Sequence, residues 1–173
     1  EDAIITNLPM FHLYGYSESA LVALLAGARQ ILMESFDAAE TLRLVEAERA
    51  TIIHGFDTHH KDMLDCQERD KRDLSSLRFA TFPSGMENSI PIARRCQREL
   101  APTITGWGMS ETWSFTACSF TDSTEEQRCE ASGFVQPGLE FRIIDPASGR
   151  ELPPGEQGEL LIRGYQVMKG YYN

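Results

Sequence analysis

Three side chains of different chemistry lie within one short segment of the chain, which reads TGWGMSET. Trp107 offers a flat indole on which a purine could stack. Ser110 offers a hydroxyl to a phosphate oxygen, and Glu111 offers a hard carboxylate of the kind that binds Mg²⁺. Gly106 and Gly108 carry no Cβ, so the backbone there could approach a ligand closely. The segment fits a nucleotide and metal site. The plainer alternative is a glycine turn with a buried tryptophan and a solvated glutamate.

Histidines and one lysine are further candidates for chemistry. His12 could serve a site, or it could be a hydrogen-bonded core residue. His54, His59 and His60 suggest a transition-metal site only weakly, because they lack the i, i+4 spacing with further ligands that such sites use. Ordinary surface or pocket roles are favoured for them. Lys169 is more typical of a solvated strand end than of a catalytic lysine.

Short apolar runs alternate with helical patterns up to about residue 120, and these elements must position the candidate residues. Alternation of this length implies right-handed βαβ crossovers and an α/β fold with a mostly parallel sheet flanked by helices. Such sheets place ligands beyond the carboxyl ends of their strands, where the tryptophan segment follows the last predicted strand. We predict strands at 3–8, 29–33, 51–54, 78–82 and 103–105, and helices at 17–28, from 37 onward, at 58–66 and from about 89 to 100.

The pattern changes after about residue 130. Leu139, Phe141 and Ile143 alternate with polar residues as in a half-buried strand, and turn residues separate them from a second strand at 159–163. These features predict a small antiparallel β-barrel or sheet. The acidic stretch 122–130 is predicted to be an exposed loop.

We therefore predict two parts, an α/β subdomain at 1–120 and a β-rich subdomain at 121–173. Both chain ends run directly into structured patterns. We expect the two parts to belong to one larger domain that is truncated at each end.

Composition excludes several classes of protein. The 173 residues carry a net charge of −10, which argues against a nucleic-acid-binding surface. No apolar run approaches the roughly 18 residues of a membrane span, and the start does not resemble a signal peptide. The four cysteines form no CxxC pair, so neither a zinc site nor a disulfide framework is indicated. A reducing cytoplasm is the expected location, and the oligomeric state is not predicted.

Four elements in order resemble the adenylate-forming superfamily, which includes acyl- and aryl-CoA synthetases, luciferases and the adenylation domains of peptide synthetases. Residues 106–111 match its aromatic-Gly-Met-Ser/Thr-Glu motif, and residues 8–12 match its Leu-Pro-x-Phe-His element. Residues 158–164, continuing to Gly170-Tyr171-Tyr172, are similar to its Gly-Glu-Leu…Gly-Tyr element. Residues 84–86 lie where the family has an adenine-contacting turn. The resemblance covers nearly the whole chain.

The resemblance implies a role for each matching residue. Trp107 would stack on the adenine, Ser110 would contact the α-phosphate and Glu111 would hold Mg²⁺. His12 would lie near the acyl pocket and the carboxylate that is activated. The catalytic residues implied are thus His12, Ser110 and Glu111. The nucleotide-binding positions are Ser84, Gly85, Met86, Gly106, Trp107, Gly108 and Ser110.

Departures from the family pattern weaken the inference of substrate class first. The family usually has Pro-Thr where this chain reads GFDTHH, and many members have Pro where it has Glu87. Trp113 is bulky where many relatives have a small residue. It could redirect an acyl tunnel, or it could pack against the following strand.

The family's phosphate loop, its ribose-binding Asp, its hinge and its catalytic Lys have no counterpart in these 173 residues. Because the charge on the transferring phosphorus centre must be neutralised, we expect the isolated chain to be inactive.

The resemblance implies a parent ligase that uses ATP, Mg²⁺ and coenzyme A. It would convert a carboxylic acid to an acyl-adenylate and then to an acyl-CoA. A fatty or aryl acid is favoured because an aromatic-rich, neutral pocket would form from Phe11, His12, Tyr14, Tyr16 and Trp113. An acyl-AMP ligase or a peptide-synthetase adenylation domain, with a carrier-protein thiol as acceptor, stays open. So does a non-catalytic α/β binding module.

Overall fold

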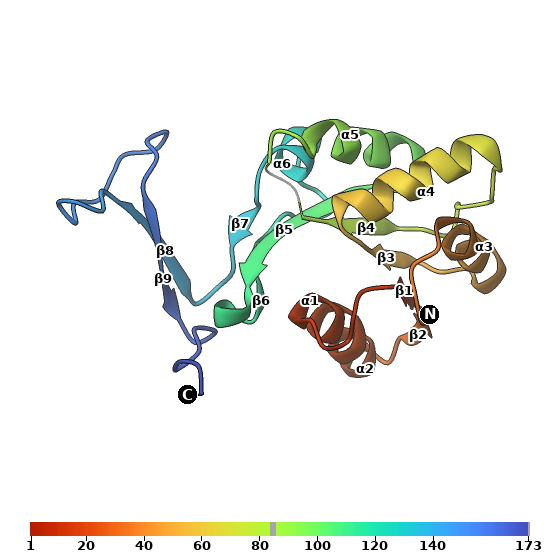
Figure 1. Ribbon diagram of the computed structural model, residues 1–173, viewed down its shortest axis with the longest axis horizontal. Coiled ribbons are helices and arrows are strands. Elements are labelled where there is room, and N and C mark those ends of the chain that lie inside the picture. The colour runs from red at the N-terminus through yellow and green to blue at the C-terminus, as the bar shows by residue number, and fades with distance from the viewer. Residues whose placement is uncertain (84–85, 173) are drawn as a thin grey trace.

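The computed structural model describes residues 1–83 and 86–172, and its centre is a seven-stranded sheet (Figure 1). The strand order is β2-β1-β3-β4-β5-β6-β7. Strands β1 to β5 pair in parallel, whereas β6 and β7 pair antiparallel to their neighbours. The mostly parallel sheet predicted from the sequence is confirmed. The strands are β1 (Ala3–Thr6), β2 (Arg29–Leu32), β3 (Ile52–His54), β4 (Phe79–Phe82), β5 (Thr103–Met109), β6 (Ser114–Cys118) and β7 (Phe134–Val135).

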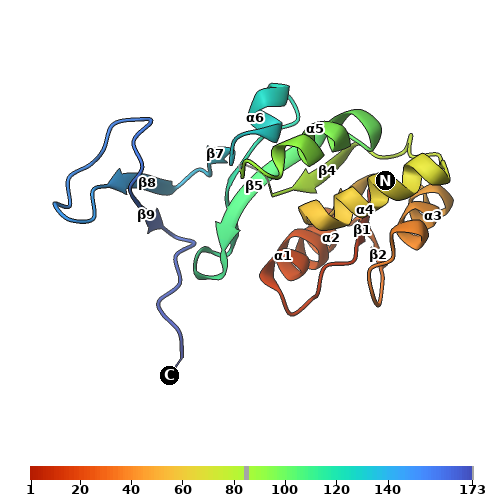
Figure 2. The ribbon, with the colours of Figure 1, turned by 45° about the horizontal axis from the view of Figure 1, so that its top comes forward.

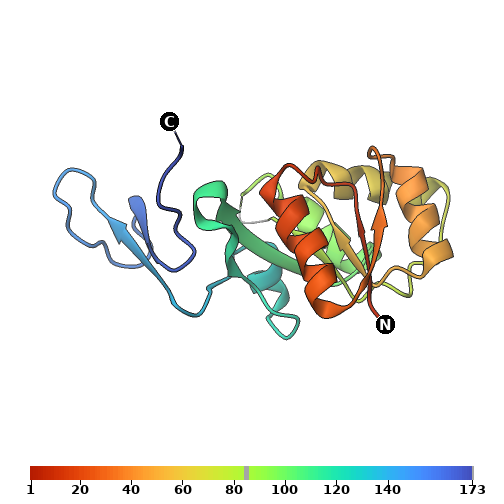
Figure 3. The same cartoon turned by 90° about the horizontal axis from the view of Figure 1, so that it is seen from below.

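Helices cover both faces of this sheet. One face carries α3 (Ala38–Glu48), α4 (Asp57–Arg69) and α5 (Ile90–Glu99), and the other carries one continuous helical run (Figures 1 and 3). That run consists of α1 (Leu13–Gly15), the π-helical turn η1 (Tyr16–Leu21) and α2 (Val22–Ala26). Alternate side chains of β1 lie on opposite faces of the sheet. Ile5 packs with α3 and α4, whereas Ile4 packs with Ala23 of α2.

The helical run begins four residues before its predicted start because His12 caps it. The His12 Nδ1 accepts a hydrogen bond of 3.2 Å from the Tyr14 amide. The run ends at Gly27, which adopts a left-handed φ of 64°, close to the predicted helix end at residue 28.

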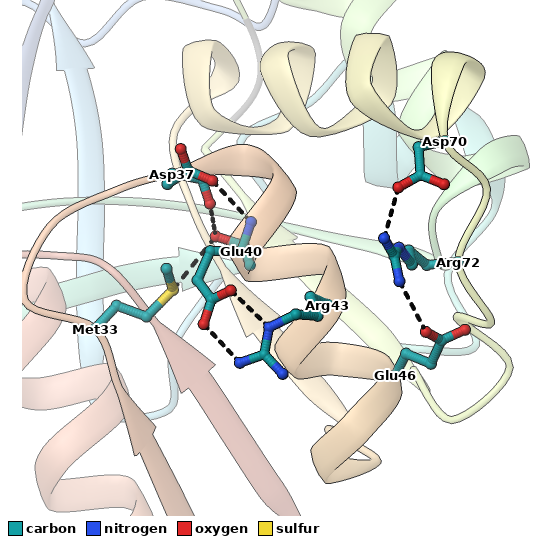
Figure 4. Close-up of polar contacts among 8 residues, drawn as sticks. Met33, Asp37, Glu40, Arg43, Glu46, Asp70 and Arg72 are labelled. Atoms are coloured by element: carbon teal, nitrogen blue, oxygen red, sulfur yellow. Dashed lines mark hydrogen bonds and ion pairs between the residues drawn. The ribbon is translucent and has the colours of Figure 1, made fainter.

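Side-chain pairs define the start and the exposed face of α3 (Figure 4). The Asp37 carboxylate accepts a hydrogen bond of 2.7 Å from the Glu40 amide, which confirms the predicted helix start. Glu40 pairs in turn with Arg43 at 2.6 Å. Arg72 lies 2.6 Å from Asp70 and 3.5 Å from Glu46, and so joins the end of α4 to α3.

The prediction of an exposed loop at 122–130 is wrong. The short helix α6 (Glu125–Cys129) lies there, beside α5, and its last residue is fully buried. Thr124 and Gln127 form a reciprocal capping box at its start. Five residues are too few to show a helical repeat, so the sequence pattern missed it.

The last two strands form a separate antiparallel hairpin. These are β8 (Leu139–Ile144) and β9 (Glu159–Gly164), and the hairpin projects away from the larger sheet (Figures 1 and 2). The antiparallel end of the chain is confirmed. The larger sheet extends to β7, which ends at Val135. Across residues 1–83 and 86–172, no helix combines the length and apolar character needed to cross a membrane.

Candidate functional site

The candidate site is a cavity of about 690 Å³ at the carboxyl ends of the parallel strands. The strand order reverses between β1 and β3, and open α/β sheets bind ligands at such a point. Segments after β1, β3, β4 and β5 contribute His12, Phe56, Pro83 and Ser110, respectively, to the lining. The size lies within the range of about 300–1,000 Å³ that is usual for small-molecule sites.

The cavity lining includes most of the residues predicted from the sequence. It contains His12, Met86, Gly106, Trp107, Gly108, Ser110 and Glu111. Ser84 and Gly85, predicted to border the adenine, lie outside the described residues. The structure thus brings an indole, a hydroxyl, a carboxylate and an imidazole to one hollow. Their roles toward a ligand stay predictions.

The first part of the tryptophan motif, from Gly106 to Met109, lies on a strand. β5 is longer than predicted because its residues from Gly106 to Met109 pair with β6. The register of this pairing shifts between Trp107 and Gly108. A Cβ on Gly106 would lie 2.7 Å from the Phe115 ring, and one on Gly108 would lie 1.4 Å from the Ser114 carbonyl oxygen. Glycine is therefore required here to admit the neighbouring strand.

A tight turn joins β5 to β6 and carries the polar end of the motif. It contains the 3₁₀ turn η2 (Ser110–Thr112), followed by Trp113 and Ser114 at φ values of 56° and 66°. Left-handed conformations are costly for such residues, and two in succession hold Ser110 and Glu111 on a sharply bent backbone. Trp113 is half exposed and lies edge-on to Tyr16 at 6.3 Å, outside the cavity lining.

The end of the chain is held against Glu111. The Tyr171 hydroxyl donates a hydrogen bond of 2.7 Å to Glu111 Oε1, and the Met168 amide donates one of 2.8 Å to the Glu111 carbonyl. The hydrogen bond from Tyr171 lowers the pKa of the Glu111 carboxyl, which favours its ionised form.

The donor set at Glu111 fits a magnesium ion. Within the part of the chain that the structure describes, no group of three or more His, Cys, Asp or Glu side chains could hold a metal by itself. Mg²⁺ in nucleotide sites commonly takes one or two carboxylates and completes its shell with phosphate oxygens and water. A single carboxylate therefore suits Mg²⁺ carried by a nucleotide.

Changing Tyr171 to Phe tests whether its hydroxyl orients Glu111. We expect the Mg²⁺ concentration that half-saturates nucleotide binding to rise about two- to fivefold, because one exposed hydrogen bond is lost. A magnesium titration that follows the binding of a fluorescent nucleotide measures this concentration. Tyr172→Phe is the matched control, since Tyr172 is fully exposed at 102%. An equal shift in both variants would exclude the orienting role.

His12 is an exposed residue of the cavity wall and not a core histidine. Its Nδ1 accepts the Tyr14 amide hydrogen bond, so the proton of the neutral ring lies on Nε2. The ring packs edge-on against Phe56 at 6.1 Å. His12 can therefore offer one N–H donor to a ligand in the cavity.

A buried polar cluster that the sequence did not predict lies behind the cavity. The Thr81 hydroxyl lies 2.6 Å from the Tyr14 hydroxyl and 2.5 Å from His54 Nδ1, and the Thr81 carbonyl lies 2.9 Å from His60 Nε2. Burial lowers the pKa of His54 and of His60 to about 4, so both rings are neutral near pH 7. A surface role is excluded for both. These residues lie on separate strands and on a helix that come together only when the chain folds. Their spacing in the sequence therefore did not indicate the cluster.

A protein-family model matches nearly the whole sequence. The model described as AMP-binding enzyme matches residues 1–172. The chain belongs to this family.

Curated relatives of this family member are CoA ligases. It is 36% identical over 175 residues to 3-[(3aS,4S,7aS)-7a-methyl-1,5-dioxo-octahydro-1H-inden-4-yl]propanoyl:CoA ligase of Rhodococcus jostii, covering 99% of this chain and 31% of that protein. It is 32% identical over 181 residues to 4-coumarate-CoA ligase 1 of Narcissus pseudonarcissus, covering 100% and 32%. The chain thus spans about a third of the length of these relatives.

Solved structures of the family have the same fold. ATP-bound MatB of Rhodopseudomonas palustris superposes with a TM-score of 0.86 at 27% identity, covering 99% of this chain and 33% of that one. The O-succinylbenzoate coenzyme A synthetase of Bacillus subtilis, in complex with ATP and magnesium ion, has a TM-score of 0.83 at 25% identity, covering 99% and 34%. The α/β sheet with its antiparallel hairpin is the fold of these enzymes.

Proposed function

We propose that this chain is the central part of a longer AMP-forming acid–thiol ligase. Its α/β and β-rich parts would belong to one adenylating domain that extends beyond both ends of the sequence. The enzyme would join a fatty or aryl carboxylic acid to ATP and then transfer the acyl group to coenzyme A. CoA is preferred over a carrier-protein thiol as acceptor because the matched relatives are named as CoA ligases. Four free cysteines agree with a reducing compartment such as the cytoplasm.

The observation that carries this proposal is the shared cavity of Trp107, Ser110, Glu111 and His12. In the first half-reaction an acid oxygen bonds to the α-phosphorus of ATP, and pyrophosphate leaves. Trp107 would stack on the adenine, and the Ser110 hydroxyl would donate to an α-phosphate oxygen. The His12 N–H would orient the acid carboxylate at the cavity wall. A magnesium ion held by Glu111 would neutralise phosphate charge.

Exchange between ATP and labelled pyrophosphate tests the function directly. The full-length protein should incorporate label into ATP only when a suitable carboxylic acid is present, because adenylate formation is reversible. A panel of fatty, aryl and polar acids would identify the acid. Acid-independent exchange, or none with any acid, would contradict the proposal and favour a non-catalytic module.

Changing Trp107 to Ala should weaken binding of AMP or a stable adenylate analogue by about 1–3 kcal/mol, the scale of base–aromatic stacking. Calorimetry on the full-length protein measures the change, and Trp107→Phe should recover part of it. Trp113→Ala is the matched control, because Trp113 lies outside the cavity lining. Wild-type affinity in Trp107→Ala would show that the indole does not contact the purine.

A further inference from the structure

The indole of Trp107 contacts the β8–β9 hairpin as well as the cavity. Its ring centroid lies 5.9 Å from that of Phe141 on β8, and the two ring planes are nearly perpendicular, at 80°. This edge-to-face arrangement is attractive because the edge of an aromatic ring is positive and its face is negative. Phe141 is not part of the cavity lining, so the hairpin reaches the indole from outside the cavity.

Neither a hydrogen bond nor regular strand geometry sets the orientation of this indole. Among residues 1–83 and 86–172, no hydrogen bond reaches the indole N–H, and Phe141 is the one aromatic ring that packs against it. The pairing register of β5 with β6 shifts between Trp107 and Gly108. Such irregularities re-aim a side chain, so the backbone does not give Trp107 the direction of a regular strand residue. The contact with Phe141 is therefore the feature that can hold the ring at one angle.

The hairpin that carries Phe141 is itself held to the larger sheet on both sides. Before β8, the Gln136 amide donates a hydrogen bond of 2.9 Å to the carbonyl of Thr116 on β6. After β9, the Tyr171 hydroxyl donates its hydrogen bond of 2.7 Å to Glu111. Phe141 thus comes from a strand that is fixed relative to the nucleotide motif, and it can support the indole from there.

We propose that Phe141 is a positioning residue of the nucleotide site, which holds the Trp107 indole at the angle needed to stack on adenine. The proposal rests on the proposed ligase function only through the placement of adenine against this indole. Stacking requires two flat rings to lie parallel. An indole that turned freely about its side-chain bonds would lose that freedom on binding, which weakens affinity. A contact that orders the ring before the nucleotide arrives removes this loss.

Phe141 and Tyr171 would then act on different parts of the same ligand. Phe141 supports the indole, so its loss should weaken the binding of AMP even without magnesium. Tyr171 bonds to the Glu111 carboxylate, so its loss should affect magnesium alone. The β8–β9 hairpin and the segment after it would thus order both the purine end and the metal end of the motif.

Titration of the full-length protein with AMP in the absence of magnesium, followed by calorimetry, tests this role. Phe141→Ala should weaken AMP binding by about three- to tenfold, and Phe141→Leu, which keeps most of the bulk, by about two- to threefold. The magnesium concentration that half-saturates ATP binding should stay the same in both variants. Leu161→Ala is the matched control and should bind AMP as the wild type does. Leu161 is 43% exposed and pairs with Arg142, so it lies on the hairpin face opposite Phe141.

A double-mutant cycle separates positioning from a purely structural contribution. In a Trp107→Ala background, a further Phe141→Leu or Phe141→Ala change should weaken AMP binding by less than about 1.5-fold, because no indole is left to orient. A residue that only stabilised the fold would weaken AMP binding by the same factor in both backgrounds. That result would overturn the inference. If Phe141→Ala fails to fold, Phe141→Leu by itself completes the cycle.

The remaining outcomes separate the inference from the proposed function. If no acid supports ATP–pyrophosphate exchange, the ligase function fails, and the AMP titration still decides the role of Phe141. If exchange occurs but both Phe141 variants bind AMP as tightly as the wild type, the inference fails while the function stands. Wild-type affinity in Trp107→Ala also overturns the inference, because an indole that does not touch adenine needs no positioning. A wild-type protein that binds no AMP contradicts both claims.

Discussion

Replacing Glu111 with alanine should reduce acid-dependent ATP–pyrophosphate exchange in the full-length protein by at least about 100-fold. Glu111 is the carboxylate that lines the cavity, and the Tyr171 hydroxyl donates a hydrogen bond to its Oε1. Without it, the magnesium ion that accompanies ATP would lose its protein ligand, and phosphate charge would be less well neutralised. Initial rates of label incorporation at saturating ATP and magnesium measure the effect.

Two comparisons separate this role from a structural one. Nucleotide binding without magnesium should change little in Glu111→Ala, because Trp107, the residue proposed to stack on the adenine, is retained. Glu126→Ala, on the exposed side of α6, should retain wild-type exchange. Exchange at the wild-type rate in Glu111→Ala would remove Glu111 from the metal site.

Lowering the pH from 7 to 5 should reduce the free energy of unfolding by about 4 kcal/mol, about 2 for each of two histidines. His54 and His60 have folded-state pKa values of about 4, because burial disfavours their charged forms, against an ordinary value of 6.5. The unfolded chain therefore binds more protons between these values. The stability that the neutral rings provide is complete above about pH 6.5 and is lost as the pH falls toward 4.

Urea unfolding at a series of pH values measures this slope. His54→Gln and His60→Gln should each remove about half of it, although each also disturbs the contacts with Thr81 and lowers stability at pH 7. A wild-type stability that is constant between pH 7 and pH 5 would contradict the buried, neutral state of both rings.

Glu18 is a charged residue whose surroundings the sequence did not indicate. It lies on η1, where burial raises the pKa of its carboxyl, although hydrogen bonds from Ser114, Ser17 and the main chain of Phe115 oppose that rise. Glu18 is one charged residue in a helical stretch, and in the sequence alone it does not differ from a solvated one. Its significance depends on which surface the helical run presents to the sheet.

The sequence by itself determined the parts of this protein that depend on local pattern. Alternating apolar runs and helical repeats predicted a mostly parallel sheet with an antiparallel end, since each such element forms from residues close together in the chain. Four ordered elements, of which residues 106–111 are one, likewise indicated the family, because each of them lies within a short run of residues.

Only the tertiary structure decided which distant residues meet. The extension of β5 depends on its pairing with β6, and the need for glycine at Gly108 depends on the main chain of Ser114. Tyr171 reaches Glu111 across 60 residues, and Tyr14 reaches Thr81 across 67. Such contacts form only when segments that are far apart in the chain come together in the folded protein. The energetic consequence of each side chain, from the neutral histidines to Glu18, therefore follows from its three-dimensional surroundings and not from its neighbours in the chain.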